Sequence, residues 1–233
     1  MPTWTGRGFE NRHAINTNVS GNIFLDDLPR MTDSKAKFTR TKIDNMFRLG
    51  YRLAFETKSK KKKWDDIFAL WYCAATNGHL RAQFYLGTCY DFGNGVKKNI
   101  SEAFKWYMKA AKKGKMEAQF NIGFFFKEGE LVKQNYKKAV HWYSLAAEQG
   151  DTEAQRDLGF CYFYGQGVKT DHSKAIYWYK KAANQGDDKA IFNLGLCYEF
   201  GDGVTQSIRW AKHYYSKASK LGHRKAKNKL KRI

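Results

Sequence analysis

The 233-residue sequence has only 2 prolines, and no stretch approaches the roughly 18 uninterrupted apolar residues that a bilayer crossing needs. Scarce proline favours long helical stretches, because proline interrupts helices more than any other residue. The polar opening up to Pro29 contains no apolar segment of the secretory kind. We therefore expect a helical, cytoplasmic protein without a membrane span, with leaderless secretion as the alternative.

Acidic residues are also scarce, since 22 Asp+Glu face 42 Lys+Arg and the formal net charge is +20. The excess is uneven: residues 118–189 carry 10 basic and 9 acidic residues, whereas residues 190–233 carry 10 and 2. Aromatic residues reach 16%, which excludes a disordered chain. Such a basic chain invites anionic partners, although lysine-rich solubility explains part of the charge.

Motifs for catalysis are missing. The sequence has no Gly-x-Ser-x-Gly, no His-Glu-x-x-His and no phosphate-binding glycine loop. Ser34 and Lys37 match Ser-x-x-Lys, a pattern that arises easily in a lysine-rich chain, so a hydrolase acting through Ser34 is the weakest hypothesis. The six histidines lack metal-ligand spacing and are interpreted as surface residues. We predict no catalytic residue, metal or cofactor, and no enzyme activity.

What dominates the sequence is a repeat of 36 residues. One block recurs as AQFYLGTCYDFGNGV, AQFNIGFFFKEGELV, AQRDLGFCYFYGQGV and AIFNLGLCYEFGDGV, beginning at Ala82, Ala118, Ala154 and Ala190. A second block of the form A-x-x-W-Y-x-x-A-A ends at glycines with the same period, namely Gly78, Gly114, Gly150, Gly186 and Gly222. Apolar residues at helical spacing in both blocks predict two helices per unit.

Polar residues mark where these helices begin. Second helices are expected to start at capping residues that share one repeat position, namely Asn99, Asn135, Asp171 and Ser207. Asp151 and Asp187 are expected to cap two first helices, and Asp65 or Asp66 an earlier second helix.

The spaced pattern A-x-x-x-L-G-x-x-Y-x-x-G-x-G-V, followed by A-x-x-W-Y-x-x-A-A-x-x-G, resembles the Sel-1-like repeat family, relatives of the tetratricopeptide repeats. The match covers residues 82–225. It implies an all-α fold, a right-handed α/α superhelical solenoid of two-helix repeats. Glu130 and Leu131 replace the second turn glycine of one unit, so that turn is expected to differ in shape.

We divide the chain into four parts. Residues 1–33 form an irregular extension, 34–78 a degenerate first repeat, 79–222 four Sel-1-like repeats and 223–233 a basic C-terminal capping segment. Cys89, Cys161 and Cys197 share one repeat position, where neighbours lie too far apart for disulfides, and Cys73 is alone at its position. We expect free thiols.

The resemblance implies that first helices line a concave groove. On that basis the candidate partner-binding residues are Tyr85, Thr88, Asn121, Phe124, Lys127, Arg156, Phe160, Phe163 and Asn193. Phe124, Phe160 and Phe163 are favoured because the pattern does not demand aromatics there, and aromatic anchors suit protein contacts. Phe84, Phe120 and Phe192 are interpreted mainly as packing residues.

The leading hypothesis is a monomeric, non-enzymatic scaffold that binds a peptide or protein partner in the groove. The alternative is an electrostatic binder of nucleic acid or another anion through its basic ends, possibly as a leaderless bacterial secreted effector. Its candidate residues are Lys60, Lys61, Lys62, Lys63, Arg224, Lys225, Lys227 and Lys229.

Overall fold

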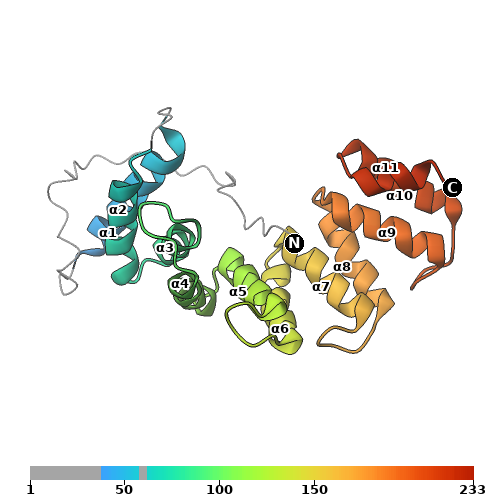
Figure 1. Cartoon of the computed structure of the whole chain (residues 1–233), viewed down its shortest axis with the longest axis horizontal. Coiled ribbons are helices and arrows are strands. Elements are labelled where there is room, and N and C mark those ends of the chain that lie inside the picture. Colours follow the sequence, from blue (N-terminus) through green and yellow to red (C-terminus); the bar gives the residue numbers. More distant parts are fainter. Residues whose placement is uncertain (1–37, 58–61) are drawn as a thin grey trace. The chain divides into compact units, whose positions relative to one another are not determined.

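A computed structural model describes residues 38–57 and 62–233 of the chain. Within these ranges every regular element is a helix (Figure 1). The chain divides into two compact units: the N-terminal unit ends at Asn121, and the C-terminal unit comprises Ile122–Ile233. The border falls inside one helix. The expected extension over residues 1–33 and the Ser34 hypothesis lie outside the described residues.

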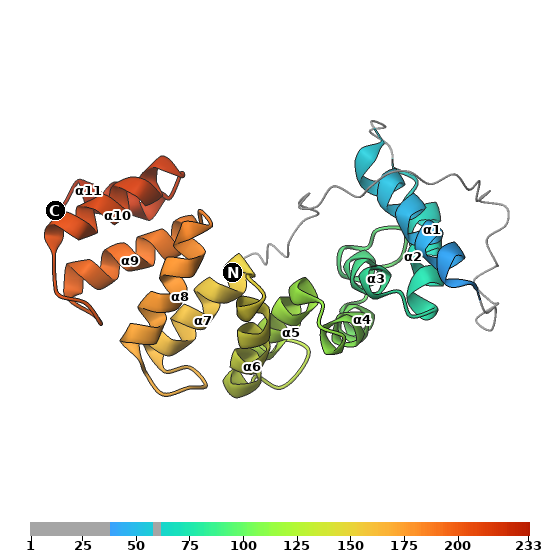
Figure 2. The same ribbon diagram turned by 180° about the vertical axis from the view of Figure 1, so that it is seen from behind.

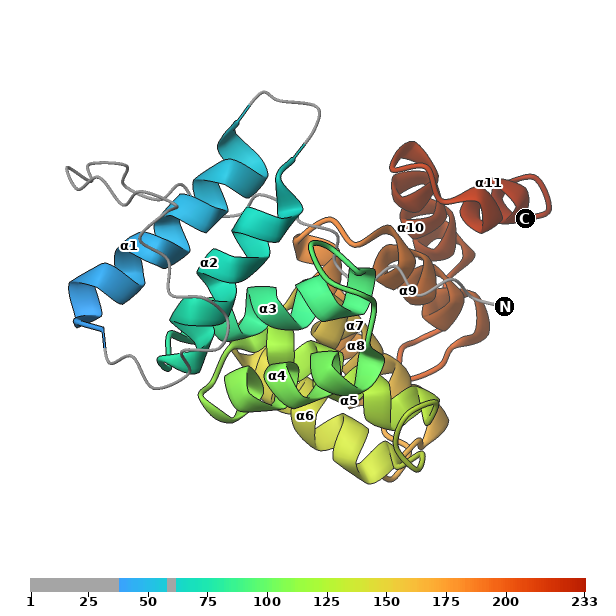
Figure 3. The same ribbon diagram turned by 60° about the vertical axis from the view of Figure 1, so that its left-hand side comes forward.

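The N-terminal unit contains a helix pair ahead of the four repeats. Helices α1 (Arg40–Tyr51) and α2 (Trp64–Thr76) pack against each other, and Figure 3 shows them side by side. A π-helical turn, η2 (Arg52–Glu56), extends α1. The spacing of the apolar residues does not predict this turn. The repeats then begin with α3 (Leu80–Phe92) and α4 (Ile100–Lys112).

The helix that crosses the border between the units is α5 (Met116–Glu128). The C-terminal unit continues with α6 (Tyr136–Glu148), α7 (Thr152–Tyr164), α8 (His172–Asn184), α9 (Asp188–Phe200), α10 (Ile208–Lys220) and α11 (Arg224–Leu230). From α6 to α11, each helix packs against the next (Figure 2). The predicted all-α class built from two-helix repeats is confirmed.

Helix capping follows the predicted period. The side chains of Asn99, Asn135, Asp171 and Ser207 each accept a hydrogen bond from a backbone N–H of the first turn. Asp151 and Asp187 cap α7 and α9 in the same way. These acceptors satisfy amides that a helix cannot pair internally.

Two expectations, one about the start of α2 and one about the histidines, were wrong. Helix α2 begins at Trp64, and the preceding Lys63 makes no side-chain cap. Asp65 and Asp66 lie inside the first turn, where their negative charges interact favourably with the helix dipole. Two of the histidines, which were expected to be surface residues, cap helices instead. The Nδ1 atoms of His79 and His223 accept from the amides of Ala82 and Ala226, and both side chains are half-buried. Neutral imidazole offers one such acceptor.

Glycines inside the first helices let second helices approach closely. A Cβ atom added at Gly159 would lie 2.7 Å from Cδ1 of the buried Tyr179 ring. The other repeats repeat this pairing as Gly87 with Tyr107, Gly123 with Tyr143 and Gly195 with Tyr215. At the equivalent place between α1 and α2, Gly50 faces Trp71. The Leu-Gly pair of the repeat therefore makes room for an aromatic ring.

The turn at Glu130 and Leu131 differs from the others, as predicted. Three turns place two glycines at positive φ, such as Gly93 at 78° and Gly95 at 69°. In the departing turn only the first survives, Gly129 at 77°, because no non-glycine residue in the described chain has positive φ. Leu131 avoids the left-handed region that its Cβ disfavours.

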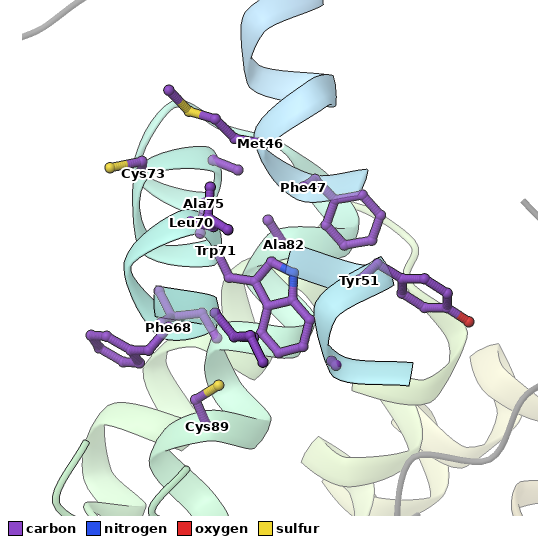
Figure 4. Close-up of a cluster of buried hydrophobic side chains, with 14 of the residues drawn as sticks. Met46, Phe47, Tyr51, Phe68, Leu70, Trp71, Cys73, Ala75, Ala82 and Cys89 are labelled. Carbon is purple, nitrogen blue, oxygen red and sulfur yellow. The ribbon is translucent and has the colours of Figure 1, made fainter. Parts of the chain in front are cut away.

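The apolar core of the N-terminal unit is centred on Trp71, which is fully buried. Figure 4 shows its indole ring pointing toward the helix that carries Phe47 and Tyr51. The Tyr85 ring stacks on Trp71 with centroids 4.9 Å apart. The C-terminal unit has a cluster of its own, built from small residues, aliphatic residues and tyrosines of α8, α9, α10 and α11.

All four cysteines are buried, free thiols, as predicted. Burial raises the pKa of Cys89, Cys161 and Cys197 to about 12, because a thiolate loses its hydration in an apolar site. None of the helices in the described ranges has the length and apolar character to cross a bilayer.

Candidate functional site

Three of the candidate partner-binding side chains, Phe124, Lys127 and Phe160, meet on the C-terminal unit where α5 approaches α7. The Lys127 ammonium lies 6.0 Å from the centroids of both the Phe124 and Phe160 rings. All three side chains are half-buried. This spacing suits a weak cation–π attraction, which holds the lysine beside the two rings.

Two more aromatic rings, those of Phe163 and Tyr164, extend this group. Tyr164 lies 4.4 Å from Phe160 and 4.9 Å from Phe163, measured between centroids, and Phe163 stacks on His172 at 4.8 Å. With 59% of its surface exposed, Tyr164 is the most accessible of these rings. We define Phe124, Phe160, Phe163 and Tyr164 as the aromatic cluster.

Sequence reasoning missed Tyr164, although a signal was present. An aromatic residue precedes the first turn glycine in three repeats, as Phe92, Tyr164 and Phe200, and all three are more than 40% exposed. An aromatic at the last position of an amphipathic helix, beyond its buried stripe, gains little from packing. An aromatic residue that recurs at this exposed position therefore indicates a role at the surface.

Charged side chains beside the aromatic cluster form a chain of ion pairs. Arg156 donates from Nε to Asp157 at 2.9 Å and from Nη1 to Asp187 at 2.8 Å, and Lys127 lies 3.9 Å from Asp157. Burial alone would lower the pKa of Arg156, but the two carboxylates outweigh it and raise this pKa. Arg156 is thus held by its own chain, while Lys127 keeps 28% of its side chain exposed.

The remaining predicted groove residues lie in different surroundings. Asn193 is half-buried on α9. In the N-terminal unit Asn121 is 4% exposed and hydrogen-bonds to Tyr107, and Thr88 is 3% exposed and donates to the Tyr85 carbonyl. Tyr85 itself packs in the aromatic core, where burial raises its pKa to about 12. Asn121, Thr88 and Tyr85 therefore offer little surface to a partner.

The predicted anion-binding residues differ in exposure and in whether they already have a partner within the chain. Lys60 and Lys61 lie outside the described residues. Lys62 donates to the backbone oxygen of Thr57 at 2.6 Å and so has a partner within its own chain, while Lys63 is exposed before the start of α2. Of the predicted residues on α11, Arg224, Lys225 and Lys227 are exposed. Lys229 instead pairs with Glu199 at 2.8 Å.

Comparison with known proteins places these features in a family. The Sel1 repeat model matches residues 80–115, 117–151, 152–187 and 188–223, more than half of the chain. The chain therefore belongs to the Sel1 repeat family, whose members are generally non-enzymatic scaffolds for protein–protein interaction. No curated protein matches the sequence.

Solved structures share the fold. A protective antigen of uropathogenic Escherichia coli, c5321, which displays the Sel-1-like repeat fold, is 33% identical with a TM-score of 0.76, and the match covers 90% of this chain and 43% of c5321. A Sel1 repeat protein from Oxalobacter formigenes is 35% identical with a TM-score of 0.71, covering 79% and 75% of the two chains. This chain thus spans less than half the length of c5321.

An immunity protein from Pseudomonas aeruginosa, PA5088, is 23% identical with a TM-score of 0.51 over 82% of this chain and 69% of its own. At that identity the likeness extends to the fold alone. The predicted solenoid class is confirmed by these relatives.

Proposed function

We propose that this protein is a non-enzymatic scaffold whose partner, a peptide or protein segment, docks on the aromatic cluster of the C-terminal unit. The observation that carries the proposal is the exposure of Tyr164, at 59%, on top of Phe160 and Phe163. Exposed tyrosine with a supporting aromatic layer offers a large apolar contact and a polar hydroxyl at low entropic cost.

The neighbouring charges set the chemistry of the partner. Arg156 is neutralised by Asp157 and Asp187, so it rigidifies the surface rather than recruiting a ligand. The Lys127 ammonium lies 3.7 Å from a Glu128 carboxylate oxygen and 3.9 Å from an Asp157 oxygen, and 28% of its side chain stays exposed beside the Phe124 and Phe160 rings. We expect a partner segment that buries an apolar side chain on the cluster and presents an acidic or carbonyl oxygen to Lys127.

The test is affinity capture from a source-cell lysate with three forms of the full chain. Tyr164→Ala removes the exposed ring, and Tyr177→Ala removes a ring of similar exposure, 51%, on α8 of the same repeat. We expect wild type and Tyr177→Ala to retain the same discrete protein, and Tyr164→Ala to lose it. Truncating a hot-spot ring typically costs at least ~2 kcal/mol, about 30-fold in affinity.

A second variant examines the layer beneath. Phe124→Ala combined with Phe160→Ala should also weaken retention while circular dichroism still reports a helical protein. If this double variant unfolds, the two rings belong to the core. If Tyr164→Ala retains the partner as well as wild type does, the proposed docking site is wrong.

A further inference from the structure

The C-terminal helices carry a surface of one charge sign. Residues 203–233 contain 10 Lys+Arg and no Asp or Glu. The structure exposes nine of these on α10, on α11 and directly after α11: Arg209, Lys212, Lys217, Lys220, Arg224, Lys225, Lys227, Lys231 and Arg232. Apart from Lys229, which meets Glu199, these basic residues form no ion pair with the described part of the chain. We call the exposed part of α10 and α11 the basic face.

Comparison between repeats shows that this charge is not demanded by the fold. Lys212 is exposed, whereas the same repeat position holds Val140 and Ile176 in earlier units, 8% and 5% exposed. Arg209 and Lys220 stand where the preceding unit has Ser173 and Asn184. Helices α8 and α10 form the same repeat element with and without these charges. The basic face is thus an addition to the repeat.

An aromatic ring stands within the basic face. Trp210 is 49% exposed, and its ring centroid lies 6.1 Å from Tyr198 and 6.2 Å from Tyr214. Tyr198 and Tyr214 are themselves stacked, with centroids 5.4 Å apart and planes 14° apart. Trp210 therefore has a rigid aromatic base and an open side.

Packing does not require tryptophan at this position. In the two preceding units a lysine covers the equivalent ring, Lys138 at 5.1 Å from Phe126 and Lys174 at 5.3 Å from Tyr162. Trp210 replaces that lysine in the most basic unit, at the cost of exposing a large apolar ring. An exposed flat ring among cations points to a ligand that has both a flat face and negative charge.

We propose that the basic face binds single-stranded nucleic acid, with an unpaired base stacked on Trp210 and the phosphates paired with lysines and arginines of α10 and α11. On a helix, residues three, four and seven positions apart share one side, so His213 and Lys217 flank Trp210. Stacking on an aromatic platform beside a basic track is how sequence-tolerant single-strand binders work. The inference is independent of partner docking at the aromatic cluster.

Other polyanions match these observations less well. A duplex offers phosphates but keeps its base faces stacked, leaving Trp210 without a partner. A membrane would need several apolar side chains on one side of the helix, but besides Trp210 the exposed large apolar residues here are Ile208 and the C-cap residue Leu221, which lie about 140° apart around the axis of α10. An acidic polypeptide supplies carboxylates without a flat ring for the indole. Single-stranded nucleic acid satisfies both the charge and the ring.

The test uses the full chain and fluorescein-labelled dT20 and U20, with binding followed by anisotropy at several salt concentrations. The decisive variant is Trp210→Lys, which installs the residue of the two preceding units and adds a positive charge. If stacking contributes, this variant binds at least about fivefold more weakly despite its extra charge. The control, Tyr177→Lys, makes the same change at a ring of similar exposure on α8 and should not weaken binding.

Charge is tested with residues that the preceding repeat already carries. Arg209→Ser and Lys220→Asn are compatible with the fold because Ser173 and Asn184 occupy these positions in α8. For each phosphate contact removed, the slope of log affinity against log salt should fall by about 0.7. Equal affinity for dT20 and U20 is expected, since neither contact reads the sugar.

Several results would overturn the proposal. Equal or tighter binding by Trp210→Lys would show an electrostatic surface without stacking. Preference for duplex DNA, for polyglutamate or for phosphatidylserine vesicles over dT20 and U20 would assign the basic face to a duplex, an acidic protein or a membrane. Failure to bind either oligonucleotide at 50 mM salt would refute the proposal that the basic face binds single-stranded nucleic acid.

Discussion

The carboxyl group of Asp91 makes the stability of the N-terminal unit depend on pH. Asp91 is 2% exposed and accepts a hydrogen bond from the Tyr107 hydroxyl at 3.1 Å. Burial raises the pKa of Asp91 from 3.8 to about 6, and the hydrogen bond and Lys98 offset only part of that effect. The folded protein therefore holds a proton on Asp91 at pH values where the unfolded chain has lost it.

The sign follows from linkage between folding and protonation. Because the pKa is raised on folding, stability falls as pH rises from about 4 to about 6 and is nearly constant above that. Between pH 7 and pH 5 the free energy of unfolding should increase by about 1.4 kcal/mol from this group. Most acidic groups that gain partners on folding have a lowered pKa, so their contribution to stability increases as pH rises.

Asp91→Asn should remove this contribution to the pH dependence. The asparagine keeps an oxygen for Tyr107 but introduces a buried N–H donor, whose cost of about 1–3 kcal/mol offsets the gain from removing the charge. The change in stability at pH 7 is therefore uninformative. The informative quantity is the difference between the free energies at pH 5 and pH 7, measured by urea unfolding followed by circular dichroism.

Glu199 provides a matched control at the same repeat position. Burial raises its pKa, but hydrogen bonds from Lys229 and Tyr215 outweigh burial, so the pKa lies below its ordinary value. Glu199→Gln should lower stability by a similar amount at pH 5 and pH 7, because this group titrates below that range. If Asp91→Asn keeps the wild-type difference between pH 5 and pH 7, the assignment to Asp91 is refuted.

The remaining predictions concern packing and thiol chemistry. Gly159→Ala places a methyl group 2.7 Å from the buried Tyr179 ring and should lower the free energy of unfolding by about 1–3 kcal/mol, measured by urea titration; an unchanged midpoint would contradict the close packing described. Cys89, Cys161 and Cys197 are at most 1% exposed, so Ellman's reagent should leave them unmodified in the native protein and titrate all four cysteines in guanidinium chloride; rapid native modification of these three would show that the helices open easily.

Much of the fold is predictable because several local signals agree in every unit. The apolar stripe, the cap residue such as Asn99 and the terminal glycine all specify the same helix boundaries, repeated every 36 residues. Even the departing turn at Leu131 is foreseeable, since a branched side chain avoids positive φ. Period and turn chemistry thus determine the elements.

The candidate site is less predictable because exposure depends on contacts between helices. Tyr85 and Thr88 occupy positions that vary between repeats. Nevertheless Tyr85 packs against the core formed by α1 and α2, and Thr88 is buried. The capping role of His79 was missed because histidine is an uncommon cap. Tyr164 and Trp210 became candidates only through their exposed surface, which periodicity alone does not report.

The most direct test of partner docking at the aromatic cluster is site-specific photo-crosslinking. Benzoylphenylalanine is introduced in place of Tyr164 or, separately, of Tyr177, two tyrosines of one repeat with 59% and 51% exposure on α7 and α8. After irradiation in lysate, we expect one discrete protein adduct from position 164 and none from position 177. Equal adducts from both positions, or an adduct from position 177 alone, would contradict docking on the cluster.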